Sequence, residues 1–218
     1  TVILAAGKGT RMKSKLPKVL HRAAGKSMLQ HVIDAAYAAG ARRNIVVTGF
    51  GGDVVRSAIG DSVEYVEQCE QLGTGHAVLQ AKDLLSGEHG TIMVLCGDTP
   101  LLTAELLARF HEEHVNAGAK ATVLTAIMPN AKGYGRIIRR ESGEVLKIVE
   151  HKDATPEERE IHEVNAGIYC FDAEALFSAL TKVTNDNAQG EYYLPDVLSI
   201  LRDSGEKIWA VVADNYES

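Results

Sequence analysis

The chain begins with a short apolar run that leads directly into a glycine-rich, cationic segment. Val2–Leu4 has the composition of a buried strand and precedes Ala5-Ala6-Gly7-Lys8-Gly9-Thr10-Arg11-Met12. Glycines let a backbone approach a ligand closely, and their N–H groups can point at phosphate oxygens. A cationic loop at the carboxyl end of a first strand is where α/β sheets place anionic ligands. The segment therefore predicts an α/β fold with an anion site after its first strand.

Strand-like and helix-like patterns alternate along the first half of the chain. Ser27, with Gln30 three residues later, is typical of a capping box at the start of a helix. We expect strands at 2–4, 44–48, 63–66 and 91–95, and helices at 27–40, 53–59, 74–85 and 103–116. This alternation predicts a mostly parallel sheet flanked by helices.

The second half of the chain has more strands and fewer helices between them. We expect strands at 121–127, 135–139, 145–150, 164–171 and 207–212, and helices at 173–180 and 195–203. Strands that follow one another without a helix favour antiparallel pairing. Because no linker or repeat interrupts the 218 residues, we predict one domain, residues 1–218, of the α/β class, with a Rossmann-like mixed, mostly parallel sheet flanked by helices.

Composition argues against several classes of function. A formal net charge of −6 is opposite to the basic face that nucleic-acid binding needs. No apolar run approaches the length that spans a membrane. Cys69, Cys96 and Cys170 are widely spaced and form no CxxC pair, which is typical of a reduced protein. We therefore expect a cytoplasmic protein with no nucleic-acid partner and no membrane association.

Three familiar motifs can be tested against the chain, and each fails. Gly25-Lys26-Ser27 matches the end of a P-loop, but Leu20 stands where the leading glycine is needed. Gly7-x-Gly9-x-x-Met12 lacks the third glycine of a dinucleotide fingerprint. His111-Glu112-Glu113-His114 does not have the HExxH order of a zinc protease and is typical of a solvated helix face.

The first loop joins its glycine-rich turn to two cations at fixed positions. These are Arg11, two residues after Gly9, and Lys18, directly after Pro17. An arginine can bind phosphate oxygens through two N–H groups, and a lysine adds a point charge. The pair suits a triphosphate whose departing pyrophosphate gains negative charge. We therefore predict that Arg11 and Lys18 are catalytic cations; the alternative is a flexible cationic surface loop.

The segment Leu4–Met12, with Pro17-Lys18-Val19-Leu20 behind it, resembles the first motif of the sugar-nucleotide pyrophosphorylases. Further matches to that family follow in the same order: Gln68-Cys69-Glu70-Gln71-Leu72-Gly73-Thr74-Gly75-His76-Ala77, Gly97-Asp98, Gly133-Tyr134-Gly135-Arg136, Glu150-His151-Lys152-Asp153-Ala154, Asn165-Ala166-Gly167 and Asn187-Ala188-Gln189-Gly190-Glu191-Tyr192-Tyr193. This series covers nearly the whole chain and is most similar to the uridyltransferase domains of bacterial bifunctional enzymes that make UDP-N-acetylglucosamine for the cell envelope.

The resemblance implies a reaction in which UTP and N-acetylglucosamine 1-phosphate give UDP-N-acetylglucosamine and pyrophosphate. The sugar phosphate oxygen would attack the α-phosphorus of UTP in line, with Mg²⁺ as cofactor and no covalent enzyme intermediate. It also implies that residues 1–218 are the uridyltransferase domain alone. The family's second domain, a left-handed β-helix acetyltransferase that forms homotrimers, would be absent, which leaves a monomer open for this chain.

Residue by residue, the resemblance assigns a nucleotide site. Gln68 would read the uracil edge, because an amide can donate and accept at once, helped by the backbone of Gly73; the alternative is a surface glutamine. Thr74 would lie close to the substrate at a helix entrance. The full nucleotide-binding set is Leu4, Ala5, Ala6, Gly7, Gln68, Gly73 and Thr74.

The resemblance also assigns a metal ligand and a sugar pocket. Asp98, at the end of a buried strand, would bind Mg²⁺, which takes hard oxygen ligands; the alternative is a carboxylate in an N-terminal turn. The substrate-binding set is Cys96, Gly97, Gly135, Glu150 and Asn165. Four neighbours are expected to support these residues rather than bind: Tyr134, Arg136, His151 and Lys152. Residues 190–193 would pack and order a loop around the pocket.

Two departures from the family pattern affect these assignments. The family often has a tyrosine where this chain has Cys96, so we expect a backbone contact there in place of a side-chain contact. The family's second magnesium ligand is an asparagine in a Gly-x-Asn segment, and the sequence stops at Tyr216-Glu217-Ser218, before such a segment. Asn215 is not its equivalent.

Two rival functions stay open on the sequence alone. Other nucleotidyltransferases of the same scaffold act on glucose 1-phosphate, methylerythritol phosphate or molybdopterin, but the stretches 68–75 and 150–153 favour N-acetylglucosamine 1-phosphate. A catalytically weak or silent nucleotide-sugar-binding module is the rival from another class. Arg11, Lys18 and Asp98 argue against it.

Overall fold

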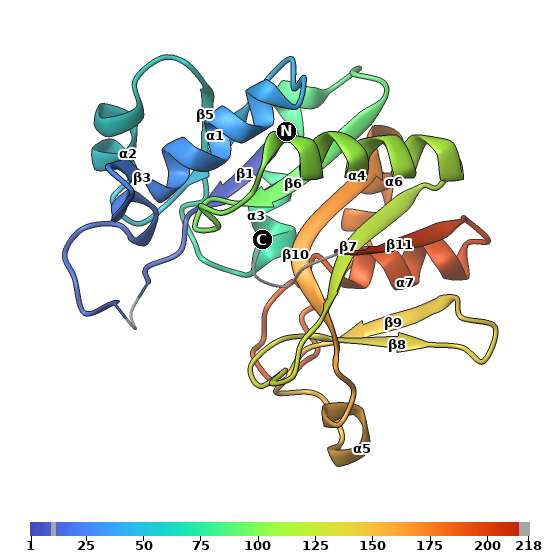
Figure 1. Cartoon of the computed structure of the whole chain (residues 1–218). Helices are drawn as coiled ribbons and strands as arrows, with labels where there is room; N and C mark the ends of the chain where they lie inside the picture. Colours follow the sequence, from blue (N-terminus) through green and yellow to red (C-terminus); the bar gives the residue numbers. More distant parts are fainter. Residues whose placement is uncertain (10–11, 214–218) are drawn as a thin grey trace.

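The computed structural model describes residues 1–9 and 12–213 (Figure 1). The strands are β1 (Val2–Ala5), β2 (Arg22–Ala23), β3 (Lys26–Ser27), β4 (Ile45–Thr48), β5 (Glu64–Glu67), β6 (Thr91–Cys96), β7 (Ala121–Ile127), β8 (Arg136–Arg139), β9 (Val145–Val149), β10 (Glu163–Asp172) and β11 (Ile208–Val212). The helices are α1 (Met28–Ala38), α2 (Gly52–Ile59), α3 (Thr74–Leu79), α4 (Ala104–Ala117), α5 (Pro156–Arg159), α6 (Ala173–Leu180) and α7 (Asp196–Asp203), with the 3₁₀ helices η2 (Lys18–Leu20) and η3 (Asp83–Leu85).

The main sheet has nine strands and combines two kinds of pairing. Its order is β11-β7-β10-β6-β1-β4-β5, and β6, β1, β4 and β5 run parallel to one another. Strand β10 is antiparallel to both β6 and β7, and the β8–β9 hairpin pairs with it. The predicted mixed sheet flanked by helices is therefore confirmed, including antiparallel pairing in the second half. The parallel half brings the carboxyl ends of β1, β4 and β6 to one edge.

Two hydrophobic layers cover the two faces of the sheet. Because successive strand residues point to opposite faces, Val2 and Ile3 of β1 belong to different core clusters. One layer packs α1 and α4 around Phe110, and the other packs α3, α6 and α7 around Phe171. Both phenylalanines are fully buried. The β8–β9 hairpin and α5 extend away from these layers (Figure 1).

The helix predicted over 74–85 is wrong beyond its sixth residue. Helix α3 ends at Leu79, and the next residues turn through i→i+3 hydrogen bonds into η3. Gln80 N donates to Ala77 O at 3.2 Å, and Lys82 N donates to Leu79 O at 3.1 Å. This tighter turn keeps Ala81 fully buried against the sheet. A buried alanine at position 81 is compatible with both an α-helix and a 3₁₀ helix, so the sequence pattern could not show that the α-helix ends at Leu79.

The capping box predicted at Ser27 forms only in part. The Ser27 side chain accepts a hydrogen bond from Gln30 N at 3.2 Å, as an N-cap should. The Gln30 side chain, however, donates to Asp34 Oδ1 at 2.8 Å, one turn further along α1, and does not return to the cap. An acidic residue at i+4 offers that amide a partner on the helix surface.

The solvated helix face predicted for residues 111–114 is confirmed for 111–113 and wrong for His114. His114 is 4% exposed, and its Nδ1 lies 2.7 Å from Thr122 Oγ1 on β7. Burial lowers the pKa of His114 to about 4, so it is neutral near pH 7. His114 lies on the inner face of α4, so one residue of this polar stretch is buried although its residue types predict exposure.

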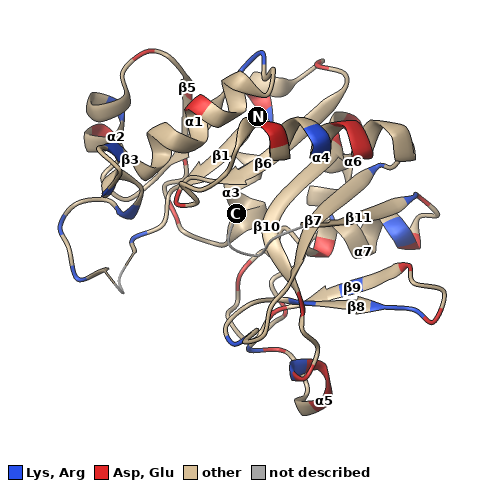
Figure 2. Ribbon diagram, viewed as in Figure 1, with Lys and Arg blue, Asp and Glu red and all other residues tan. Residues whose placement is uncertain are grey.

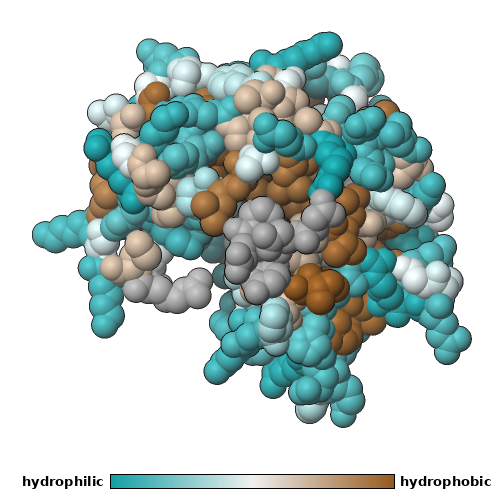
Figure 3. Space-filling model, viewed as in Figure 1, coloured by the Kyte–Doolittle hydropathy of each residue, from teal (hydrophilic) through white to brown (hydrophobic). Residues whose placement is uncertain are grey.

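The surface carries its basic residues unevenly. Figure 2 shows Lys and Arg along the segment between β1 and β3, where Lys8, Lys13 and Lys15 are exposed. Hydrophobic side chains gather near the centre of the view in Figure 3, where Figure 1 places β7 and β11. Trp209 is the largest exposed side chain of β11. Within the described residues, no helix combines the length and apolarity that a bilayer span requires.

Candidate functional site

A cavity of about 390 Å³ opens at the carboxyl ends of β1 and β6. Its walls come from the loop after β1, from η2, from the loop that leads into α3 and from the chain after β6. The predicted residues that line it are Leu4, Ala5, Ala6, Gly7, Lys18, Gln68, Gly73, Thr74, Cys96 and Asp98. The structure thus brings the predicted nucleotide site, one of the two predicted catalytic cations and the predicted metal ligand to a single cavity.

The loop after β1 is shaped around two glycines and Lys18. Gly9 has φ +57°, and a Cβ at this position would lie 2.7 Å from Lys18 Cβ. Lys18 begins η2, whose next residues, Val19 and Leu20, are buried and fix its position. Arg11, the other predicted cation, lies outside the described residues. The loop therefore contributes at least one cation, Lys18, to the cavity that Gly7 also lines, and a Cβ on Gly7 would meet nothing within 4 Å.

Lys18 and Asp98 both line the cavity and form an ion pair with each other. Their side chains are 34% and 26% exposed, so both can reach a ligand. Asp98 is placed by Gly97, whose N–H donates to Leu4 O at 2.9 Å and ties the end of β6 to β1. A Cβ on Gly97 would lie 3.0 Å from that oxygen, which explains the glycine. A lysine and a carboxylate at one site suit a ligand that brings both phosphates and a cation.

The donor set at Asp98 fits one mode of magnesium binding. Within residues 1–9 and 12–213, no group of three or more His, Cys, Asp or Glu side chains could enclose a metal ion. Mg²⁺, however, is commonly held by one or two carboxylates, with substrate phosphates and water completing its shell. Asp98 is a hard oxygen ligand that lines a cavity of about 390 Å³ together with Lys18. The residues present therefore fit the mode in which substrate phosphates complete the metal's shell, and do not fit a closed all-protein site.

Gln68 lies at the buried end of the cavity and is 3% exposed. Its Nε2 donates to Gly73 O at 3.0 Å and lies 2.9 Å from His76 Nδ1. These two contacts use the amide hydrogens, which leaves Oε1 as the free acceptor. No described residue accepts from Gly73 N. The site therefore offers one side-chain acceptor and one backbone donor on two residues that contact each other, a pattern that can complement a base edge.

Gly73 is required by the packing of this loop. Its φ is +109°, and a Cβ here would lie 2.6 Å from Tyr192 O and 2.8 Å from Tyr192 N. The next residue, Thr74, begins α3, and its Oγ1 accepts from Leu194 N at 3.0 Å. The entrance to α3 is thus shaped by backbone that lies about 120 residues later in the chain.

The three predicted sugar residues lie together but do not line this cavity. Asn165 N donates to Gly135 O at 2.9 Å, and a Cβ on Gly135 would lie 3.1 Å from Glu150 Oε1. The Asn165 side chain donates to Tyr169 OH at 2.6 Å and accepts from Gly167 N at 2.9 Å. The β10–β7 pairing shifts register between Asn165 and Tyr169, where this polar cluster lies.

Two residues connect the sugar cluster to the cavity. Cys96 lines the cavity, and its Sγ lies 3.6 Å from Gly167 O. Burial raises the pKa of the Cys96 thiol to about 12, so it is neutral. Glu191 also lines the cavity. The pKa of Glu150 is raised most by its own burial and then, in decreasing order, by the charges of Asp153, Asp196 and Glu191. The two predicted subsites are therefore neighbours.

The expected supporting residues make no new subsite. Arg136 is 2% exposed and donates to Tyr134 O and to Arg159 O, the latter at 3.2 Å. Burial lowers the pKa of His151. Lys152 donates to Gln189 Oε1 at 2.8 Å. These contacts hold the β8–β9 hairpin and the turn after it.

Sequence reasoning missed two polar residues of the cavity, Gln71 and Glu191. Gln71 Nε2 donates to Gln68 O at 3.2 Å, and a Cβ on Gly49 would lie 3.0 Å from that nitrogen. Both residues belong to motifs quoted above, so their motifs were found but their roles were not. Glu191 could have been suspected because a carboxylate beside glycine and two tyrosines is an unusual packing residue.

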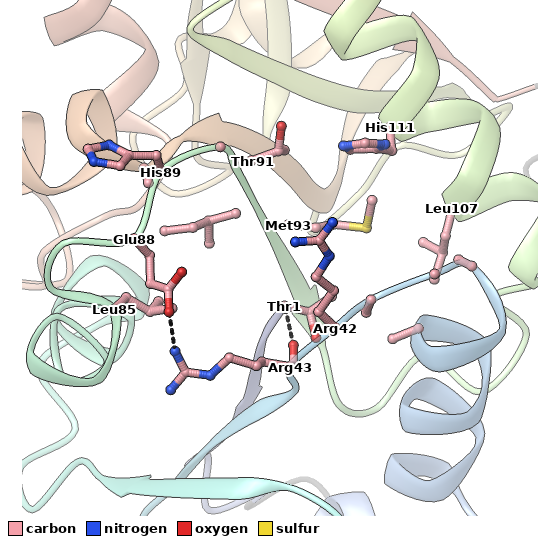
Figure 4. Close-up of a pocket in the computed structure, with 17 residues that line it drawn as sticks. Thr1, Arg42, Arg43, Leu85, Glu88, His89, Thr91, Met93, Leu107 and His111 are labelled. Carbon is pink, nitrogen blue, oxygen red and sulfur yellow. Dashed lines mark hydrogen bonds and ion pairs between the residues drawn. The ribbon is translucent and has the colours of Figure 1, made fainter.

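A second cavity, of about 510 Å³, lies at the opposite, amino-terminal edge of the sheet (Figure 4). In that view Arg42 extends beside Met93 toward His111, whereas Arg43 turns away and pairs with Glu88 at 2.8 Å. None of the described residues that the motifs assign lines this cavity. Ligands of open α/β sheets bind outside the carboxyl ends of the strands. We therefore assign the site to the smaller cavity.

Comparison with known proteins agrees with this geometry. The profile of the nucleotidyl transferase family matches residues 1–216. The chain is 56% identical over 216 residues to the bifunctional protein GlmU of Bacillus velezensis, an alignment that covers 99% of this chain and 47% of that protein. The GlmU protein of Halalkalibacterium halodurans is 59% identical over 209 residues, covering 96% of this chain and 46% of that protein. The chain thus spans about half the length of these relatives.

A solved structure of UDP-glucose pyrophosphorylase complexed with UDP-glucose superposes with a TM-score of 0.80. The match covers 95% of this chain and 88% of that chain, at 19% sequence identity. At that identity the likeness establishes the shared fold.

Proposed function

The chain belongs to the nucleotidyl transferase family, and we propose that it transfers the uridylyl group of UTP to N-acetylglucosamine 1-phosphate, releasing pyrophosphate. Enzymes of this family generally use a divalent metal ion, and we propose Mg²⁺. The observation that carries the proposal is the single cavity that gathers Lys18, Asp98 and Gln68 next to the polar cluster of Glu150 and Asn165.

In the proposed reaction an oxygen of the sugar phosphate attacks the α-phosphorus of UTP. A new oxygen–phosphorus bond forms, and the bond from the α-phosphorus to the bridging oxygen of the β-phosphate breaks, so both electrons of that bond leave with pyrophosphate. No side chain needs to form a covalent bond, so the protein's task is positioning and neutralisation of charge. Lys18 would bind phosphate oxygens, with the open backbone at Gly7 beside it. Arg11 is proposed as the second cation.

Asp98 would hold the metal ion, which supplies Lewis-acid stabilisation of the phosphate oxygens when bound. In the structure the Asp98 carboxylate is paired with Lys18. Entry of a triphosphate and a cation would give each partner a new counter-charge: phosphate oxygens for Lys18 and the metal for Asp98. The ion pair would thus keep both side chains at the cavity until substrate arrives.

Gln68 and Gly73 would recognise the base. Oε1 of Gln68 can accept from the N3–H of uracil, and Gly73 N can donate to a uracil carbonyl. Cytosine has no hydrogen on N3, so it would place two acceptors against each other. A buried acceptor without a donor is costly, and sites of this kind discriminate strongly between such analogues.

Glu150 and Asn165 would hold the sugar. Glu150 has two acceptor oxygens for hydroxyl groups, and Asn165 can serve hydroxyl or acetamido groups. Gly135 leaves room beside them, since any side chain there would meet Glu150. Cys96 and Gly97 would contact the substrate through their backbone.

The wider setting is also proposed from the relatives. We propose that residues 1–218 act as the uridyltransferase domain and that the full-length family enzyme is a homotrimer built by its second domain. The cysteines are free thiols, and Cys170 is buried, which agrees with a cytoplasmic enzyme. Its product would serve cell-wall synthesis.

Pyrophosphate release tests the proposal. The chain is mixed with UTP and N-acetylglucosamine 1-phosphate, with Mg²⁺ or with a chelator. We expect turnover that requires the metal and both substrates. Faster turnover with glucose 1-phosphate would replace the sugar assignment, and binding of UTP without any turnover would identify the chain as a silent nucleotide-binding module instead.

A further inference from the structure

The predicted sugar carboxylate, Glu150, is not held by its own side-chain contacts. Within the described part of the chain, no group donates a hydrogen bond to the Glu150 carboxylate. It also lies among other carboxylates, because Asp153, Asp196 and Glu191 all raise its pKa, after burial itself. What fixes its position is the turn that follows β9, in which Asp153 N and Ala154 N donate to Glu150 O at 2.9 and 3.0 Å.

That turn is tied to a distant segment through the side chain of Asp153. Ala188 N donates to Asp153 Oδ1 at 2.8 Å, and Tyr193 OH donates to Oδ2 at 3.3 Å. Gln189 Nε2 in turn donates to Tyr193 OH at 2.7 Å. A backbone N–H that meets a carboxylate makes a charge-assisted hydrogen bond, which is stronger than a neutral one. We call residues 187–194 the bridging segment.

The other end of the bridging segment is bound to the nucleotide side of the site. Tyr192 N donates to Leu72 O, and Gly75 N donates to Tyr192 O, both at 2.8 Å. Leu194 N donates to the Thr74 hydroxyl at 3.0 Å. None of these bonds involves Asp153. The bridging segment therefore has two separable attachments, one to the loop at 72–75 and one to the turn at 150–154.

The geometry points to Asp153 as a positioning residue for the sugar subsite, a role that rests on the proposed function. By accepting from Ala188 and Tyr193, its carboxylate holds the turn at 150–154 against the bridging segment and so holds Glu150 against Gly135. Without it, the turn keeps, within the described residues, only the exposed Lys152–Gln189 hydrogen bond to the bridging segment and can move away from the neighbouring carboxylates. The nucleotide subsite keeps its own bonds to Tyr192 and Leu194 and stays formed.

A substitution series tests this role. Asp153→Ala removes both carboxylate oxygens that accept from Ala188 and Tyr193. We expect KM for the sugar phosphate to rise about 10- to 100-fold, the size of effect that misplacing a substrate-binding group can have. UTP affinity, measured by titration with UTP alone, should stay within about twofold. Asp153→Asn keeps Oδ1 for Ala188 N and should restore most of the loss. Tyr193→Phe removes the longer bond to Asp153 and the bond that Tyr193 OH accepts from Gln189, but it keeps the bond from Ala188 N to Asp153, so it should have the smaller effect.

Asp186→Ala is the matched control, since Asp186 is exposed, carries the same charge and precedes the bridging segment. It should leave both affinities unchanged. An equal loss of affinity for UTP and sugar phosphate in Asp153→Ala, or no change in either, would overturn the positioning role. If the wild-type chain prefers another sugar phosphate, the proposed substrate fails, but the effect of Asp153→Ala should then appear in the KM for that compound.

Discussion

Lys18→Met separates the two roles that Lys18 could have, in substrate binding and in stability. Methionine keeps the unbranched stem that packs against Gly9, where the Lys18 Cβ lies close to the glycine backbone. It removes the charge that faces the cavity and pairs with Asp98. The substitution therefore deletes the proposed phosphate contact with little change in packing.

The two roles predict effects of different size. A hydrogen bond to a charged group is worth about 1.5–3 kcal/mol, so losing one to a phosphate should lower kcat/KM for UTP about 10- to 150-fold. A partly exposed ion pair such as Lys18–Asp98 contributes about 0–1 kcal/mol to the free energy of unfolding. We thus expect a large kinetic loss in a protein whose stability is almost unchanged.

The assay compares steady-state pyrophosphate release with urea unfolding for the same preparations. Lys15→Met is the control, because Lys15 is exposed on the same loop and does not line the cavity. It should retain wild-type kcat/KM. The reasoning is refuted if Lys18→Met keeps kcat/KM within about threefold of wild type, or if its activity falls only in proportion to lost stability.

Three other variants test separate parts of the account. Gly73→Ala places a Cβ at φ +109° and 2.6 Å from Tyr192 O, so it should lower the free energy of unfolding by about 1–3 kcal/mol and raise KM for UTP; unchanged thermal unfolding would contradict this packing. Burial and nearby carboxylates raise the pKa of Glu150 above the usual 4.5. As the pH falls, KM for the sugar phosphate should therefore begin to rise at a higher pH than it would with an unperturbed glutamate, and Glu150→Gln should flatten that profile. Burial lowers the pKa of His114 from 6.5 to about 4, so in this pH range the unfolded chain binds a proton that the folded chain does not. The free energy of unfolding should therefore decrease as the pH falls from 6.5 to about 4. In urea titrations at several pH values, His114→Gln should lack this decrease.

The sequence predicted the site best where charged side chains follow the carboxyl ends of strands. Lys18 and Asp98 were predicted separately, and they meet because β1 and β6 are adjacent parallel strands whose carboxyl ends share one edge. Gln68 and Gly73 are only five residues apart, so their contact is local and could be anticipated from the motif.

Contacts between distant segments could not be predicted in this way. The Asp153–Tyr193 bond joins residues 40 apart, and the Thr74–Leu194 bond joins residues 120 apart. Such pairs depend on how the β8–β9 hairpin and the chain before α7 pack on the sheet. The sequence pattern also failed at His114, because only the three-dimensional packing of α4 shows that one polar residue of that run faces Thr122.

The central claim is that this chain transfers the uridylyl group of UTP to one particular sugar phosphate, and product identity tests it most directly. The chain, with Mg²⁺, is offered UTP, CTP and dTTP together with N-acetylglucosamine 1-phosphate and glucose 1-phosphate, and the nucleotide sugars are identified by mass spectrometry. The account predicts UDP-N-acetylglucosamine as the dominant product. A dominant product with another base or another sugar, or no nucleotide sugar at all, would contradict it.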